Sequence, residues 1–143
     1  MAKTRSRKTQ ENATWKAFSK YIRARDAIRT TGTLANVECF TCGQILPTGA
    51  SQAGHIVSRA FNGALFNEKV VFAQCAHCNL HREGMHVFGF LNLVSLVGFD
   101  RAEAIVLDSV KPRPLTMFDL EDLEDGCELA LEVLEQFYEE NAR

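Results

Sequence analysis

The chain lacks any run of about 18 consecutive apolar residues, and the basic residues at its N-terminus are not followed by an apolar segment. The first absence excludes a membrane-spanning helix and the second leaves no visible secretory signal, so we expect a cytoplasmic protein. With 143 residues, the chain is too short for a large multidomain enzyme. No repeat stands out, and 46% hydrophobic and 24% charged residues are typical of a globular domain.

A net charge of only −2 hides a strong separation of charge along the chain. The first 29 residues carry nine basic and two acidic side chains, whereas the last 29 carry ten acidic side chains and one basic. A basic arm on an otherwise neutral body suits a polyanion such as nucleic acid, although a solvated helix face would show the same charges. The residues expected to contact phosphates here are Lys16, Lys20 and Arg23.

The hydrophobic pattern predicts a flexible basic tail over residues 1–10, followed by a single domain over 11–143. Apolar residues recur at helical spacing over 11–30, which predicts an amphipathic basic helix. The further predicted elements are strands over 52–59 and 70–74, a loop over 44–51, a helix beginning at or just after Cys75, and helices over 86–97, 101–110 and 117–139.

Capping patterns delimit the C-terminal helices. Gly98 suits the position after a helix. Asp100 with Glu103, and Thr116 with Asp119, have the spacing of capping boxes that open the next two helices. The last helix is expected to bury one stripe of side chains, made of Leu120, Leu123, Cys127, Ala130, Leu134 and Phe137.

Four of the five cysteines form two Cys-x2-Cys pairs, Cys39 with Cys42 and Cys75 with Cys78. Two thiolates at this spacing can reach one tetrahedral Zn²⁺, and two such pairs complete a four-cysteine site. Disulfides are the rival interpretation, but a leaderless protein is not expected to keep them. A redox pair is disfavoured because there are two copies and no β-α-β pattern. The sequence therefore predicts one structural zinc ion.

Two polar residues within this framework suggest chemistry. His55 lies on a predicted strand and Asn79 directly follows the last cysteine, so a strand, loop, strand and helix can bring them to face each other across a shallow site. The spacing resembles that of the zinc-stapled HNH (ββα-metal) nucleases, including phage endonuclease VII. That resemblance implies that His55 acts as general base on water, and that the helix supplies a ligand to a catalytic Mg²⁺ or Mn²⁺.

Over roughly residues 15–105 the chain more closely resembles the phage NinG (Rap) recombination proteins. The matching motifs are FSKYIRARD at 18–26, Cys39-x2-Cys42-Gly43, Ala53-Gly54-His55, Phe66-Asn67-Glu68, Gln74-Cys75-x2-Cys78-Asn79, His81 and Gly84. The resemblance implies a nuclease acting on branched DNA such as Holliday junctions and forks, in the bacterial host cytoplasm. It also implies that Asn79 and His81 ligate the catalytic cation.

Two positions depart from the expected pattern. Family members usually carry an asparagine where this chain has Val70, so either Asn67, three residues earlier, does its work or the site is weakened. Many HNH nucleases have an aspartate where this chain has Gly54, which leaves Gln52 and Glu83 as further candidate metal ligands. Arg59 and Arg82 flank the site and are suited to clamp a phosphate through two hydrogen bonds.

These observations predict an α+β fold in which a zinc-stapled ββα-metal (HNH) core over residues 37–85 follows one helix and precedes about three helices over 86–143. The expected partner is branched or duplex DNA, with no membrane. A homodimer is compatible with the two-fold symmetry of a junction. Two alternatives stay open: a catalytically silent zinc module that binds nucleic acid, and a sequence-preferring HNH nicking or restriction enzyme.

Overall fold

The computed structural model describes residues 4–81 and 86–142, without the side chain of His81. Its elements are α1 (Arg7–Thr31), β1 (Asn36–Glu38), β2 (Ile45–Pro47), η1 (Thr48–Ala50), β3 (Gln52–His55), α2 (Asn62–Leu65), β4 (Val71–Gln74), η2 (His77–His81), α3 (His86–Val97), α4 (Phe99–Ser109) and α5 (Met117–Asn141). Five helices of the α type and two small two-stranded sheets among these elements confirm the predicted α+β class.

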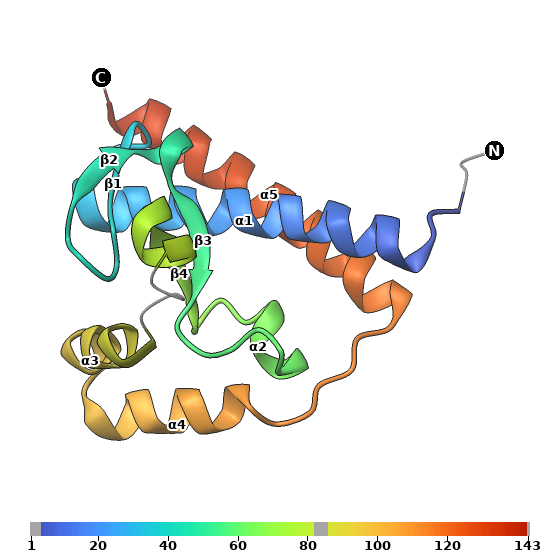
Figure 1. The fold of residues 1–143 in the computed structure, drawn as a ribbon. Helices are drawn as coiled ribbons and strands as arrows, with labels where there is room; N and C mark the ends of the chain where they lie inside the picture. The colour runs from blue at the N-terminus through green and yellow to red at the C-terminus, as the bar shows by residue number, and fades with distance from the viewer. Residues whose placement is uncertain (1–3, 82–85, 143) are drawn as a thin grey trace.

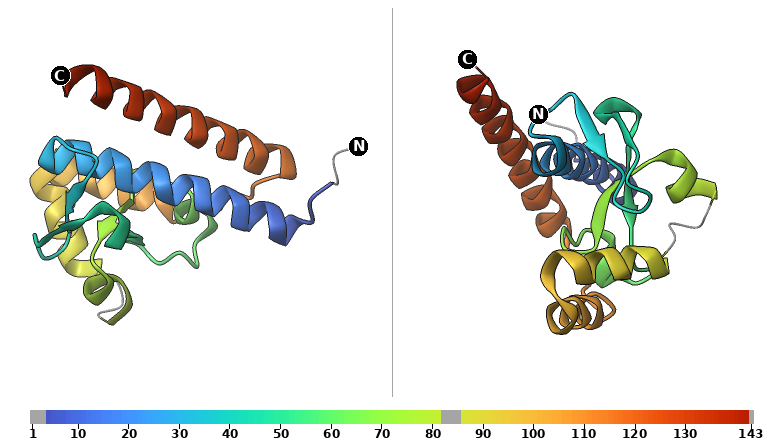
Figure 2. Two further views of the ribbon diagram at one scale, coloured as in Figure 1. Left: turned by 90° about the horizontal axis from the view of Figure 1, so that it is seen from above. Right: turned by 90° about the vertical axis from the view of Figure 1, so that its left-hand side faces the viewer.

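Helix α1 lies between α5 on one side and the strands on the other (Figures 1 and 2). Phe18 and Ile22 of α1 are fully buried in the main hydrophobic core, which also holds residues of β3 and β4. On the opposite side, the Thr14 hydroxyl donates to the Leu120 carbonyl of α5 at 2.9 Å. This second contact explains why α1 buries polar as well as apolar side chains.

The N-terminal segment is more ordered than the sequence predicts. The Ser6 hydroxyl accepts from the Thr9 backbone N–H and caps α1, so the helix includes residues 7–10. Gln10 is buried, and its amide donates to Glu124 of α5 at 2.7 Å. The prediction of a flexible tail over 1–10 is therefore wrong for residues 7–10, which are helical, because α5 supplies polar partners that the local sequence does not show.

Strands β3 and β4 form an antiparallel pair in which Gln52 lies opposite Gln74 and His55 opposite Val71. All four residues of β4 are buried, as expected for a strand covered on both faces. A second pair, β1 with β2, lies partly within the predicted loop over 44–51. Strand β2 is only three residues long and ends at Pro47, so it leaves no alternating pattern to detect.

The C-terminal helices follow the predicted bounds closely, with one correction. Gly98 has φ of +88° and its N–H donates to Val94 at 2.8 Å, which confirms it as the residue after α3. Because α4 begins at the next residue, Asp100 lies inside that helix and the capping box predicted there is wrong. The second box, Thr116 with Asp119, is confirmed at the start of α5.

The outer face of α5 stays exposed. Phe137, assigned to the buried stripe, has 56% of its surface exposed, because the fully buried residues of α5, Leu120 and Cys127, lie in its first half. Leu129 and Val133 are exposed on the same helix, and the homodimer stays a prediction. Among the described residues, no helix has the length and apolar character needed to cross a membrane.

Candidate metal centre

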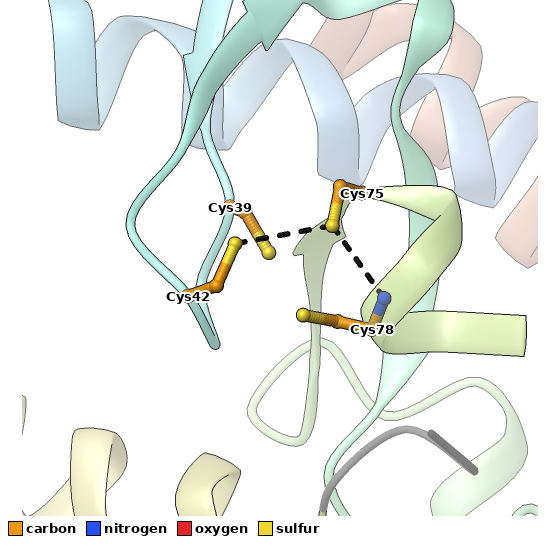
Figure 3. A group of neighbouring side chains, drawn as sticks. All are labelled: Cys39, Cys42, Cys75 and Cys78. Carbon is orange, nitrogen blue, oxygen red and sulfur yellow. Dashed lines mark hydrogen bonds between the residues drawn. The ribbon is translucent and has the colours of Figure 1, made fainter. Parts of the chain in front are cut away.

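Four cysteine side chains from two segments converge (Figure 3). Cys39 and Cys42 lie in the connection from β1 to β2, and Cys75 and Cys78 lie in the turn after β4. Their sulfur atoms all lie within 4.8 Å of one another, and the Cys42 and Cys75 sulfurs are 3.9 Å apart. Within residues 4–80 and 86–142, this is the one group of three or more histidine, cysteine or acidic side chains close enough to hold a metal ion.

Local backbone geometry shapes both turns. Gly43 has φ of +77°, a left-handed conformation that other residues rarely adopt, and its N–H donates to the Cys39 carbonyl at 2.9 Å. In the second turn, the Cys78 N–H points at the Cys75 sulfur at 3.5 Å. The Asn79 N–H donates to the Cys75 carbonyl at 3.0 Å, which begins a helical turn directly at the cysteine.

The sulfur positions fit a zinc ion. Tetrahedral Zn²⁺ with Zn–S bonds of about 2.3 Å separates its sulfur ligands by about 3.8 Å, close to the distance between Cys42 and Cys75. A disulfide needs about 2.05 Å, and all five cysteines are free. Burial raises the pKa of the Cys78 thiol far above its usual range, and a bound cation would offset that cost and hold this sulfur as a thiolate. The cluster is thus able to hold zinc, as predicted.

His55 is the last residue of β3, with 7% of its surface exposed. Its Nε2 lies 2.9 Å from the carbonyl oxygen of Leu65 on α2. A carbonyl oxygen only accepts, so Nε2 carries the hydrogen and Nδ1 of the neutral ring is an acceptor. Burial lowers the pKa of His55; the Leu65 bond opposes this shift, and the charges of Arg59 and His86 add to it. The imidazole is therefore neutral at neutral pH, with Nδ1 able to take a proton.

Asn79 lies next to Gly54, where neighbouring side chains occupy the space that a Cβ atom would fill. Its amide nitrogen donates to Gln52 Oε1 at 2.8 Å, which leaves Asn79 Oδ1 as an acceptor. That oxygen lies 2.8 Å from the point a Cβ on Gly54 would occupy, and the Gln74 side chain lies closer still. An aspartate at position 54 would therefore require the Gln74 side chain to move away, which the glycine avoids.

Asn79 contacts β3 at Gly54, the residue before His55. His55 is the last residue of β3, and the ring of Trp15 from α1 stacks on its imidazole. Asn79 and His55 thus lie at neighbouring positions at the end of β3, and their facing each other across a shallow site stays a prediction.

Asn67 lies in the loop before β4 and accepts hydrogen bonds from the backbone N–H groups of Lys69 and Val70. Its side-chain oxygen accepts from the Lys69 N–H at 3.0 Å, and its carbonyl accepts from the Val70 N–H at 3.1 Å. Val70 itself is fully buried in the main core, where an asparagine would bury an amide. Asn67 therefore ties this loop together while Val70 serves packing.

The predicted DNA contacts have mixed surroundings. Arg59 is exposed in the loop after β3, and Lys16 and Lys20 are both exposed on α1. Arg23 is half-buried and donates to the Ser19 carbonyl of its own helix at 3.2 Å. Arg82, Glu83 and the side chain of His81 lie outside the described residues.

Sequence reasoning missed Trp15 as a neighbour of the site. It also missed that the Gln74 side chain lies against Gly54, because nothing in the sequence marks this glutamine as part of a site. The stack of Trp15 on His55 joins segments far apart in the sequence, and only the hydrophobic spacing of α1 indicates that Trp15 faces inward.

The comparisons with known proteins extend the resemblance over nearly the whole chain. The family model described as the bacteriophage lambda NinG protein matches residues 1–136. No curated protein and no solved structure matches the chain. The matched range contains both cysteine pairs, His55 and Asn79 and reaches well into α5. With a match of this extent, the chain belongs to the bacteriophage lambda NinG family.

Proposed function

We propose that this protein is a metal-dependent DNA endonuclease of the HNH type that cuts branched recombination intermediates. The observation that carries the proposal is His55: a buried, neutral imidazole whose Nε2 is committed to the Leu65 carbonyl, so that Nδ1 is the proton acceptor. Asn79 lies beside the preceding residue, in the turn that begins at Cys75. The NinG family membership and the cysteine cluster support the same proposal.

In this mechanism, His55 Nδ1 takes a proton from a water molecule as the water oxygen bonds to phosphorus and the bond to the leaving oxygen breaks. A positioned general base of this kind contributes about 10² to 10⁴ in rate. Asn79 Oδ1 would hold a divalent cation, which stabilises the negative charge on the phosphate and leaving oxygen when bound. His81 is the second proposed ligand, and the exposed Arg59 is proposed to bind phosphate, with Arg82 as its counterpart.

A catalytically silent zinc module is the second candidate, and the surroundings of Gly54 favour it. The space where many HNH nucleases have an aspartate is filled by Gln74, and Asn79 donates to Gln52. The described residues there offer amide oxygens rather than a carboxylate, which Mg²⁺ sites usually include. Such a module would bind DNA without cutting it.

The test uses the purified zinc-loaded chain, a labelled four-way junction and Mg²⁺ or Mn²⁺, with fork and linear duplex substrates in parallel. The His55→Ala variant should keep its zinc and its junction affinity within a few-fold, and should cut about 10² to 10⁴ times more slowly. The Asn79→Ala variant should need more metal for half-maximal rate, and excess metal should partly rescue it. No metal concentration should rescue His55→Ala.

The His77→Ala variant is the matched control, because His77 is an exposed histidine between two cysteines of the cluster. Its cleavage rate should equal that of the wild type. If the wild type binds junctions yet leaves every substrate intact, the binding module is the better description. Cleavage confined to particular sequences of linear duplex would favour the nicking or restriction enzyme instead.

A further inference from the structure

The Trp15 indole lies almost parallel to the His55 imidazole. The ring centroids are 5.4 Å apart and the planes differ by 14°, the geometry of an offset stack. Trp15 comes from the third turn of α1, whereas His55 ends β3, so the contact joins the N-terminal helix to the proposed general base. Trp15 is also the only tryptophan in the chain.

Two phenylalanines pack against the indole. The Phe18 ring lies 5.7 Å from that of Trp15, and the Phe66 ring lies 6.1 Å from it. Phe18 and Phe66 also contact each other edge to face, at 5.8 Å. Phe66 directly follows Leu65, whose carbonyl accepts from His55 Nε2. One aromatic cluster therefore lies behind both contacts that hold the imidazole.

These two contacts restrict different motions of the ring. The offset stack on Trp15 limits the tilt of the imidazole plane, and the hydrogen bond to Leu65 limits rotation within that plane. A histidine with one of the two contacts alone would keep one rotational freedom. With both, the direction of Nδ1 is determined before any substrate binds, which is how a site gains rate from orientation.

We propose that Trp15 is the positioning residue of this site, holding the His55 imidazole by stacking so that Nδ1 is presented as the base. This inference rests on the proposed function, in which His55 accepts a proton from water. Trp15 acts through His55 and needs no contact with the reacting atoms.

The indole also contributes to the burial that keeps His55 neutral. The charged and titratable groups that act on the imidazole are Arg59, from the loop after β3, and His86, at the start of α3. Trp15 and Val71, which approach from α1 and β4, are uncharged. Removing the indole would admit water to the ring, so the pKa of His55 would rise toward its ordinary value near 6.5.

The first test needs no activity, because a protonated imidazole stacked on indole quenches tryptophan fluorescence. Tryptophan emission of the zinc-loaded wild type should fall as the pH is lowered, with a midpoint below about 6.5. In the His55→Gln variant the same change should be absent, with zinc content and circular dichroism followed in both. An identical titration in both proteins, or none in the wild type, would overturn the proposal.

The second test uses cleavage. The Trp15→Leu variant should cut about 10²-fold more slowly, with the acidic limb of its pH–rate profile moved to higher pH. Trp15→Phe should stay within a few-fold of the wild type, because phenylalanine can stack in the same place. The Ile22→Val variant is the control, altered at a fully buried position on α1. It should lose stability, but the acidic limb of its pH–rate profile should stay at the wild-type pH.

The outcomes separate this inference from the proposed function. If Trp15→Leu cuts at the wild-type rate and the acidic limb of its pH–rate profile does not shift, the positioning role is refuted and the proposed nuclease function is unaffected. Should the wild type cut nothing, the nuclease proposal fails and Trp15 positions no base, although the fluorescence titration would still establish the stack.

Discussion

Asp26 shows how a single buried charge can join two elements. Its carboxylate is fully buried, with Oδ2 accepting from the Ala73 N–H of β4 at 2.7 Å and Oδ1 accepting from Arg25 at 2.9 Å. Arg25 in turn donates to the backbone carbonyls of Glu68 and Val71. A buried carboxylate is tolerated when it is paired and hydrogen-bonded in this way. The basic residue at position 25 therefore serves docking of α1 on β4 rather than phosphate binding.

The Asp26→Asn substitution should destabilise the protein by about 3 to 5 kcal/mol, because it removes one partner of a buried ion pair. The asparagine side chain has nearly the same volume as aspartate, but its NH2 group would face either Arg25 or the Ala73 N–H. Both of these groups are donors, so one hydrogen bond would be lost. Urea unfolding of the zinc-loaded protein, followed by circular dichroism, measures the loss. Asp125→Asn, an exposed change on α5, should stay within about 0.5 kcal/mol of the wild type. Equal stability of the two variants would contradict the role of Asp26.

At the scale of elements, the two hairpins are too small to be stable alone. Strands β1 and β2 have three residues each and β3 and β4 have four, whereas an isolated two-stranded hairpin is marginal in water. The cysteine cluster joins the β1–β2 connection to the turn after β4, so a metal bound there would link the two sheets. Binding free energy at such a site is also folding free energy.

We expect one zinc ion per chain, and its loss in the Cys75→Ala variant should unfold both hairpins. Elemental analysis of reduced protein gives the zinc content, and amide hydrogen exchange locates the unfolded segments. Cys127→Ala is the matched control and should keep its zinc. Cys127 lies on α5 outside the cluster, and burial raises the pKa of its thiol to about 11. The expectation would be contradicted if the reduced wild-type protein contained no zinc and the amides of its strands were still protected from exchange.

For the molecule as a whole, folding brings the two charged ends of the sequence together. Lys16 and Lys20 of α1 line a groove of about 450 Å³ whose other wall is α5. The acidic side chains of α5 that line it are Glu124, Glu128, Glu132 and Glu135. A DNA phosphate approaching these lysines would therefore meet carboxylates nearby, so α5 should weaken binding through this face of α1.

Replacing Glu128, Glu132 and Glu135 together by glutamine should raise DNA affinity by about tenfold at low salt, since each exposed charge contributes at most about 1 kcal/mol. The expected reason is relief of repulsion on phosphates at Lys16 and Lys20. Alanine at both lysines should lower affinity and reduce the log–log salt slope by about one for each phosphate that is no longer neutralised. Fluorescence anisotropy over a range of salt concentrations measures both effects.

The control for this prediction replaces Glu139 and Glu140 by glutamine, since both are exposed near the C-terminal end of α5 and neither lines the groove. With both variants compared at about 0.1 to 0.15 M salt, its affinity should change less than that of the groove variant, because the Debye length there is only about 8 to 10 Å. Similar gains in both variants would mean that total charge, rather than the groove, governs binding.

Features determined by neighbouring residues could be predicted from the sequence. The Cys-x2-Cys spacing predicts the sulfur cluster, and the bounds of α3 and the capping box of Thr116 and Asp119 are confirmed. The capping box and the turn within each Cys-x2-Cys pair depend on groups a few residues apart, and such groups meet whenever the local backbone forms a turn or a helix. The meeting of the two cysteine pairs depends on the tertiary structure.

Other features depend on contacts between distant segments, and only the tertiary structure decided them. The start of α1 depends on partners from α5, and the crowding at Gly54 depends on Gln74 of the paired strand. The stack of Trp15 on His55 likewise needs α1 to dock on β3. A residue's own neighbours in sequence carry no record of which distant side chain will lie against it, because that is set by how the elements pack to bury their apolar faces.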